Sequence, residues 1–106
     1  MQLEMNIKLK KEYKQKFSEL RAIINSWELI PDSPTDEFDS INHLFLSQLY
    51  NGSDKFKISK KIQFELTNNY GFSIEHIDSN KMTIEVLEWW NNFNKSYHGN
   101  SNLSEL

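Results

Sequence analysis

The chain of 106 residues contains no cysteine, only three glycines and two prolines. The missing thiols exclude disulfide bridges, cysteine nucleophiles and thiolate metal sites. So few turn-forming residues argue against an all-β chain with many tight turns, and the composition is neither collagen-like nor that of a disordered chain. A chain of this length forms one domain with one modest core.

Long apolar runs are also missing, since no segment approaches the ~20 apolar residues that cross a bilayer. The first residues, 1–6, show neither the basic flank nor the apolar stretch of a secretory signal. We therefore expect a cytoplasmic protein without a membrane partner. Twelve Lys and Arg against fifteen Asp and Glu leave a net charge of −3, which argues against a general nucleic-acid binder.

Apolar residues recur at helical spacing in four segments, and no segment alternates cleanly enough to predict a strand. The first predicted helix covers residues 7–28 and stops before Pro31, because proline disfavours helical geometry in the residue before it. The second is predicted to begin at Ser33, which can cap it, with Asp36 as a capping-box acid. It should end at Gly52.

The third predicted helix is capped by Ser53 and stops at Gly71, where a left-handed residue is favoured. The connector 72–77 alternates briefly, which leaves both an extended and a helical form open. A fourth helix begins at Asp78 or the next residue. The chain then runs out of apolar side chains, so 97–106 are predicted to be a flexible tail.

Four amphipathic helices with short connections predict an all-α fold, a small four-helix bundle formed by residues 1–96 as one domain. Each stripe must find an apolar partner, because helices of this length gain most of their stability from packing. The predicted stripes are Leu9, Tyr13, Phe17, Leu20, Ile24 and Trp27; then Phe38, Ile41, Leu44 or Phe45, and Leu49; then Phe56, Ile58, Ile62, Leu66 and Tyr70; and finally Met82, Val86, Trp89 and Phe93.

Groups that could carry chemistry are sparse. Asp36, Asp39 and His43 lie at steps of three and four, but no HExxH spacing or second paired histidine accompanies them. Pairing of the acids with the helix dipole, together with a solvated histidine, is the simpler explanation of this pattern. No GxSxG, P-loop or GxGxxG motif occurs, and no carboxylate lies in an apolar run. We expect no enzyme, no metal and no cofactor.

Charge is segregated along the chain. Residues 27–39 contain five acids and no base. Such a run suits docking onto a basic partner by electrostatic steering, although it also suits helix capping and solubility. The predicted partner-binding residues are these acids with two tryptophans as candidate anchors: Trp27, Glu28, Asp32, Asp36, Glu37, Asp39 and Trp90.

Two other segments are basic. Residues 8–16 hold five lysines against Glu12, and residues 55–61 hold four lysines and no acid. These clusters could contact phosphates, but they lack regularly interleaved aromatic residues or an RNA-binding signature, so we expect no direct nucleic-acid partner. Trp89 and Trp90 lie about 100° apart on a helix, and one of them is expected at its rim, either as packing or as a partner-facing residue.

Residues 24–31 and 34–39 resemble a small bacterial family catalogued as domain of unknown function 1871. That family has a Trp-acid step at the end of a first helix, here Trp27-Glu28, then a loop into an acidic-aromatic-Asp start. The resemblance covers roughly residues 20–75 and implies a helical fold. Further similar positions lie in the third-helix region: Ser53, Lys60, Ile62, Phe72 and Ser73.

Small acidic bacterial proteins of this kind also look like immunity proteins of contact-dependent inhibition or polymorphic toxin systems. The leading hypothesis is therefore an immunity protein that binds a cognate toxin domain, expected to be a nuclease, and covers its basic active-site surface. The alternative is a structural or regulatory helical domain that self-associates through the Trp89-Trp90 helix. When free, the protein is expected to be a monomer or a weak dimer.

Overall fold

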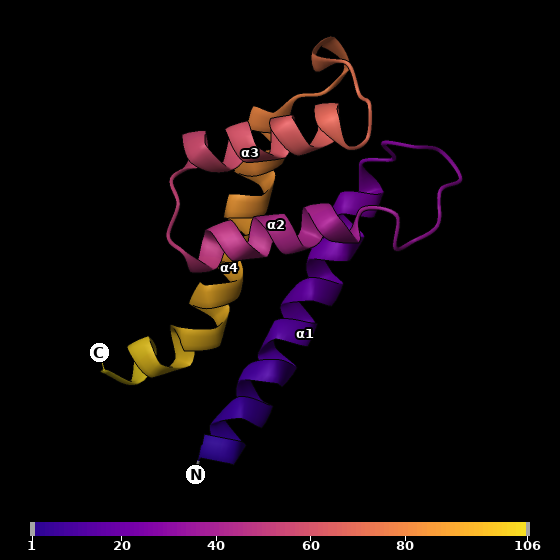
Figure 1. Ribbon diagram of the computed structural model, residues 1–106. Helices are drawn as coiled ribbons and strands as arrows, with labels where there is room; N and C mark the ends of the chain where they lie inside the picture. Colours follow the sequence, from indigo (N-terminus) through magenta and orange to yellow (C-terminus); the bar gives the residue numbers. More distant parts are fainter. Residues whose placement is uncertain (1, 106) are drawn as a thin grey trace. The chain divides into compact units, whose positions relative to one another are not determined.

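The computed structural model describes the backbone of residues 2–105 and the side chains of residues 10–93. Four α-helices and one 3₁₀ helix follow one another, and no strand occurs between residues 2 and 105 (Figure 1). The predicted all-α fold class is confirmed. The elements are α1 (Gln2–Ser26), α2 (Asp39–Tyr50), α3 (Lys55–Asn68), η1 (Ile74–His76) and α4 (Ser79–Glu105).

The chain divides into two compact units, Met1–Ser47 and Gln48–Leu106, and the boundary falls within α2. The single domain over residues 1–96 stays a prediction. The predicted flexible tail, 97–106, lies outside the residues whose side chains the structure describes. In the part of the chain that is described, no helix combines the length and apolar character that crossing a bilayer requires.

In the first unit, α1 starts earlier than predicted and ends two residues sooner, at Ser26. Its last turn tightens, because the amides of Trp27 and Glu28 donate to the carbonyls three residues back, each at 3.1 Å. Of the predicted stripe on α1, Leu20 and Ile24 are buried and the three aromatic residues are half-buried, while Leu9 lies outside the residues whose side chains the structure describes. Leu46 joins the buried set from α2. The buried apolar side chains of this unit are Leu20, Ile24, Phe38, Ile41, Phe45 and Leu46.

The start of α2 differs from the prediction. The helix begins at Asp39, so the predicted cap at Ser33 and the capping-box role of Asp36 are wrong. In a helix starting at Ser33, the Thr35 carbonyl would accept from the Asp39 amide. Here the Asn25 side-chain amide donates to that carbonyl at 3.1 Å, and the Asp39 amide donates to the Asp36 carbonyl at 3.2 Å. A tertiary hydrogen bond thus replaces a local helical one.

The turn between α2 and α3 follows the prediction at its glycine. Gly52 has φ 74° and donates to the Leu49 carbonyl, while the next amide, of Ser53, donates to the Gln48 carbonyl at 3.0 Å. This pair of bonds is a Schellman motif. Because Ser53 completes that motif, it does not cap α3 as predicted. Asp54 is the cap, and its Oδ1 accepts from the Lys57 amide at 2.8 Å.

In the second unit, α3 packs against α4. Ile58, Ile62 and Leu66 are buried on α3, and Met82, Val86 and Phe93 are buried on α4. The Ser59 hydroxyl lies 3.0 Å from that of Ser79, which adds a buried polar contact between the helices. The six apolar positions just named were predicted, whereas two further members of the predicted stripes, Tyr70 and Trp89, are only half-buried. Phe56, predicted to face inward, is 69% exposed.

The connector 72–77 before α4 contains η1, a short 3₁₀ helix. The sequence left an extended and a helical form open, and the structure has the helical one at η1. The connector follows Gly71, which is left-handed at φ 74° as predicted. Helix α4 begins at Ser79, also as predicted, because the Asp78 carboxylate accepts from the Lys81 amide at 3.0 Å.

Substitution of Gly71 tests the left-handed backbone assigned to this position. A Cβ atom added there would meet no atom within 4 Å, so the cost of Gly71→Ala arises from the positive φ alone. We expect the free energy of unfolding, measured in urea, to fall by about 1 kcal/mol in Gly71→Ala. Gly71→Asn should cost less, because asparagine tolerates this region. An alanine variant as stable as the parent would contradict the assignment.

Candidate functional site

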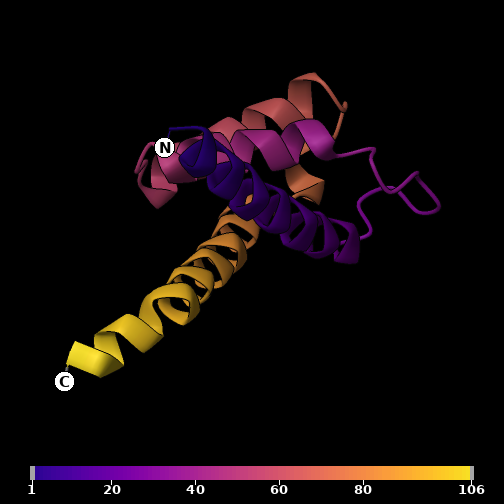
Figure 2. The same cartoon turned by 90° about the horizontal axis from the view of Figure 1, so that it is seen from below.

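The segment between α1 and α2, residues 27–38, is named the acidic loop. It projects beyond the ends of the two helices that it joins (Figures 1 and 2). The loop contains no lysine or arginine. Four of the predicted site residues on it are exposed acids: Glu28, Asp32, Asp36 and Glu37.

Two of these acids lie in left-handed backbone, Glu28 at φ 50° and Asp32 at φ 65°. Each such residue costs about 1 kcal/mol relative to ordinary backbone, so the loop needs contacts that maintain its shape. The structure supplies three. Asn25 binds the Thr35 carbonyl, the Ser33 amide donates to the Ile30 carbonyl at 3.2 Å, and Phe38 at the loop's end is only 4% exposed.

A pocket of about 270 Å³ lies under the acidic loop. It is smaller than most substrate pockets, which span roughly 300–1,000 Å³, so it is sized for a side chain more than for a whole substrate. Apolar and carboxylate groups share its wall, a combination that suits the stem and head of a basic side chain. The lining residues are Ile24, Leu29, Ile30, Pro31 and Phe38 with Asn25, Glu28, Asp32, Ser33 and Thr35.

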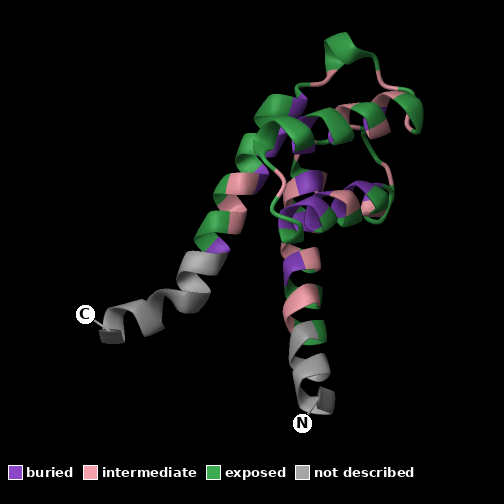
Figure 3. Ribbon diagram, turned by 60° about the vertical axis from the view of Figure 1, so that its left-hand side comes forward, coloured by how far each residue is buried: buried purple, intermediate pink, exposed green. Residues whose placement is uncertain are grey.

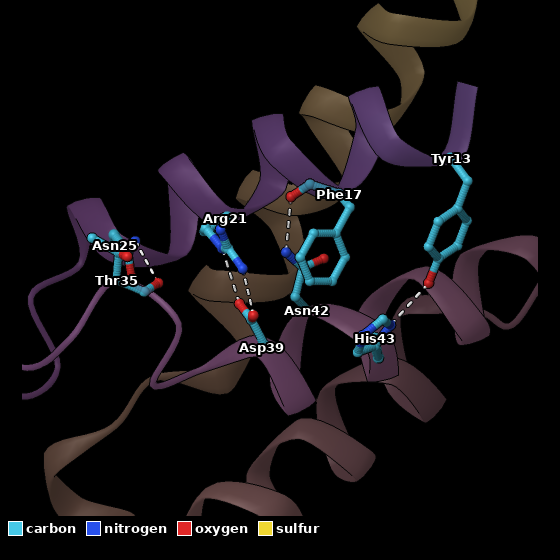
Figure 4. Close-up of polar contacts among 8 residues, drawn as sticks. All are labelled: Tyr13, Phe17, Arg21, Asn25, Thr35, Asp39, Asn42 and His43. Carbon is cyan, nitrogen blue, oxygen red and sulfur yellow. Dashed lines mark hydrogen bonds and ion pairs between the residues drawn. The ribbon is translucent and has the colours of Figure 1, made fainter. Parts of the chain in front are cut away.

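Asp39 has a different environment from the loop acids. Its carboxylate forms a two-pronged ion pair with Arg21 on α1, in which Nε donates to Oδ1 at 3.0 Å and Nη2 donates to Oδ2 (Figure 4). Donation of these hydrogen bonds to Asp39 raises the pKa of Arg21 above its ordinary value. Burial opposes this rise, while the charges of Asp39 and Asp36 add to it. The predicted partner-facing charge of Asp39 is thus engaged inside its own unit.

The two predicted tryptophan anchors are both half-buried. Trp27 packs edge-on against Phe45 in the first unit, with ring centres 6.2 Å apart. Trp90 belongs to the second unit, where it packs edge-on against Tyr50 at 5.2 Å. Its neighbour Trp89 lies 6.0 Å from Phe93. Each tryptophan therefore has a packing role in its own unit.

Sequence reasoning missed a polar and aromatic row between α1 and α2 (Figure 4). The Tyr13 hydroxyl lies 3.0 Å from His43 Nδ1, and the Phe17 ring lies 4.7 Å from the imidazole. His43 contacts Tyr13, and Asp39 is paired with Arg21. His43 and Asp39 therefore do not come together with Asp36 as a metal-ligand set. No group of three possible metal ligands occurs among the residues that the structure describes.

Asn42 belongs to the same row and lies on its buried side. It is fully buried, and its amide nitrogen donates to the Phe17 carbonyl at 2.9 Å. Its Oδ1 has no hydrogen-bond partner among the described residues. A signal for this row exists in the sequence, since Asn42 and His43 interrupt an otherwise apolar stretch and Arg21 follows Leu20 of the predicted stripe. Hydrophobic spacing alone does not pair them.

Comparison with protein-family models, with curated proteins and with solved structures finds no match. The resemblance to domain of unknown function 1871 therefore stays a prediction. The case for this site depends on its own geometry.

Replacing Glu28 separates the loop's backbone from its charge. Because Glu28 occupies a left-handed position, Glu28→Gly should raise the free energy of unfolding by up to about 1 kcal/mol. Glu28→Ala removes the same charge without relieving the backbone, so it should bring no gain. Urea unfolding of both variants measures the difference, and equal stabilities would refute the strained position.

Asn42→Asp tests the buried row by placing a carboxylate oxygen against the Phe17 carbonyl. Burial raises the pKa of the new acid, so at neutral pH the variant should lose about 3 kcal/mol or more of stability. Protonation favours the folded form, so the loss should shrink as pH falls toward the unfolded value of about 4. Asn91→Asp, at an exposed position of α4, is the control and should change little. A pH-independent loss would argue against a buried charge.

Proposed function

We propose that this chain is a binding protein whose acidic loop docks onto a basic surface of a partner protein. The observation that carries the proposal is the projection of four exposed carboxylates on a loop without a base. Arg21, the lysine or arginine nearest to the acidic loop in the sequence, is already paired with Asp39. A concentrated negative field of this kind accelerates encounter with a positive surface and orients it.

The pocket under the loop supports a protein partner in preference to a small substrate. Its apolar wall can cover the methylene stem of a lysine or arginine, while Glu28 and Asp32 face the charged head. Contacts from Asn25 and Phe38 hold the loop in place before binding, which lowers the entropy lost on association. Steering and a prepared pocket together suit specific binding and not catalysis.

We further propose that the partner is a bacterial toxin domain and that this chain is its immunity protein, acting in the cytoplasm. The resemblance to small acidic bacterial families supports this step. So does the chemistry of nucleases, which hold phosphate in cationic clefts that a loop of carboxylates can occupy instead. The alternative, self-association through the Trp89-Trp90 helix, has less support, because both rings already have packing partners within their unit.

The test uses the protein that co-purifies with this chain from its native cell, which the proposal expects to be a toxin domain. That protein is immobilised, and association rates are measured over a range of salt concentrations. The variant combines Asp36→Lys with Asp32→Asn, since asparagine keeps the left-handed backbone accessible. We expect association to slow by about tenfold at low salt and its salt dependence to flatten.

A matched control changes the charge by the same amount elsewhere. Glu75→Lys with Glu88→Gln alters two exposed acids of the second unit and should leave the association rate close to that of the parent. Circular dichroism checks that helicity is unchanged in both variants. Equal slowing by the two double variants would show that net charge, and not the acidic loop, governs binding.

A further inference from the structure

The outward side of α3 carries an unusual set of exposed residues. Phe56 is 69% exposed and Phe64 is 67% exposed. Lys57, Lys60 and Lys61 are exposed with them, and Figure 3 shows exposed and buried residues alternating around this helix. We name these five residues the α3 basic face. An exposed phenylalanine leaves apolar area in water, and apolar area gathered on one side of a helix is a feature of interaction surfaces.

Helical geometry places the five residues on one arc. Counting from Phe56, Lys60 lies about 40° around the helix and Phe64 about 80°, with the other two lysines within about 140°. The buried residues Ile58, Ile62 and Leu66 lie on the other side, against α4.

No acid interrupts this arc. Asp54 is the helix cap below the first turn, where its carboxylate accepts from the Lys57 amide. Glu65 lies about 180° from Phe56 and accepts a hydrogen bond from Asn69 at 2.6 Å. A fourth cation borders the arc, since Lys55 Nζ lies 5.4 Å from the centre of the Phe56 ring. The α3 basic face is thus aromatic and positive throughout.

We propose that the α3 basic face binds the surface of an anionic lipid bilayer. In this arrangement α3 lies parallel to the membrane, and the two phenylalanine rings enter the interface between headgroups and acyl chains. The lysines extend their stems along the apolar boundary and bring their ammonium groups to the lipid phosphates. The net charge of −3 does not prevent this, because charges beyond a Debye length of about 8–10 Å are screened.

The spacing of the rings favours a bilayer over a nucleic acid. Phe56 and Phe64 are eight residues apart, about 12 Å along the helix axis, with Lys60 between them. Neighbouring bases in a strand lie about 3.4 Å apart, so the two rings cannot stack on adjacent bases. A folded acidic protein would need two matching pockets at this distance, whereas a lipid interface deforms around any two projecting rings.

This inference reverses the expectation of no membrane partner. That expectation came from the lengths of apolar runs, which detect helices that cross a bilayer. Binding to the surface needs only one face of a helix, and the sequence pattern had assigned Phe56 to the core.

The experiment measures co-sedimentation of the full chain with vesicles made of equal parts phosphatidylcholine and phosphatidylserine. Vesicles of phosphatidylcholine alone serve as the comparison. We expect binding to the anionic vesicles, weaker binding in high salt, and little binding to the neutral ones. Phe56→Ala with Phe64→Ala should weaken binding by about tenfold or more, because the rings supply the buried apolar area. Both positions are exposed on a helix, so alanine is compatible with folding.

Matched controls isolate the face. Lys57→Gln with Lys61→Gln should reduce binding to the anionic vesicles, whereas Lys11→Gln with Lys14→Gln, which removes two exposed lysines of α1, should not. Equal loss in both lysine pairs, or binding that survives the loss of both rings, overturns the proposal. The proposal is also overturned if the protein binds a single-stranded oligonucleotide or polyglutamate and does not bind vesicles. In that case the α3 basic face is assigned to a nucleic acid or to an acidic protein.

The result is separable from the function proposed for the acidic loop. Asp36→Lys with Asp32→Asn leaves the α3 basic face intact and should retain vesicle binding. The phenylalanine pair should in turn leave association with the toxin domain unchanged. Failure of either measurement therefore concerns only its own surface.

Discussion

The ion pair between Arg21 and Asp39 is the interaction on which the candidate site depends. Arg21 is the only arginine of the chain, and it meets both oxygens of a carboxylate at the first residue of α2. Arginine suits this task because its planar fork matches a carboxylate in two places. The pair joins α1 to the start of α2 and removes Asp39 from the charge that the acidic loop offers outside. Asp36 adds to the field at Arg21 but stays exposed.

The shape of the acidic loop depends on contacts with residues at its two ends. Left-handed backbone at Glu28 and Asp32 turns the chain sharply after α1, and the bond from Asn25 to the Thr35 carbonyl closes the loop onto that helix. Burial of Phe38 then starts α2. These features oppose the local preference for an earlier helix start, and they maintain a shape that the loop residues would not adopt by themselves.

The two units present surfaces of opposite character. The first carries the acidic loop, in which charge dominates and the apolar groups line a small pocket. The second carries the α3 basic face, in which two aromatic rings project among lysines. Surfaces so different in chemistry suit different partners, a basic protein in one case and an anionic lipid interface in the other. We therefore propose two binding functions for this small helical chain, one on each unit, that can be altered independently.

Spacing in the sequence determined the helices, because an apolar residue every three or four positions has one structural solution in water. Gly52 and Gly71 marked the turns, since their backbone disfavours other residues. Only the tertiary structure decided the start of α2, the pairing of Asp39 and the exposure of Phe56. Each of these depends on which groups from distant segments compete for the same hydrogen bond or the same apolar surface. The spacing of apolar residues within one segment does not show which distant group will form the contact.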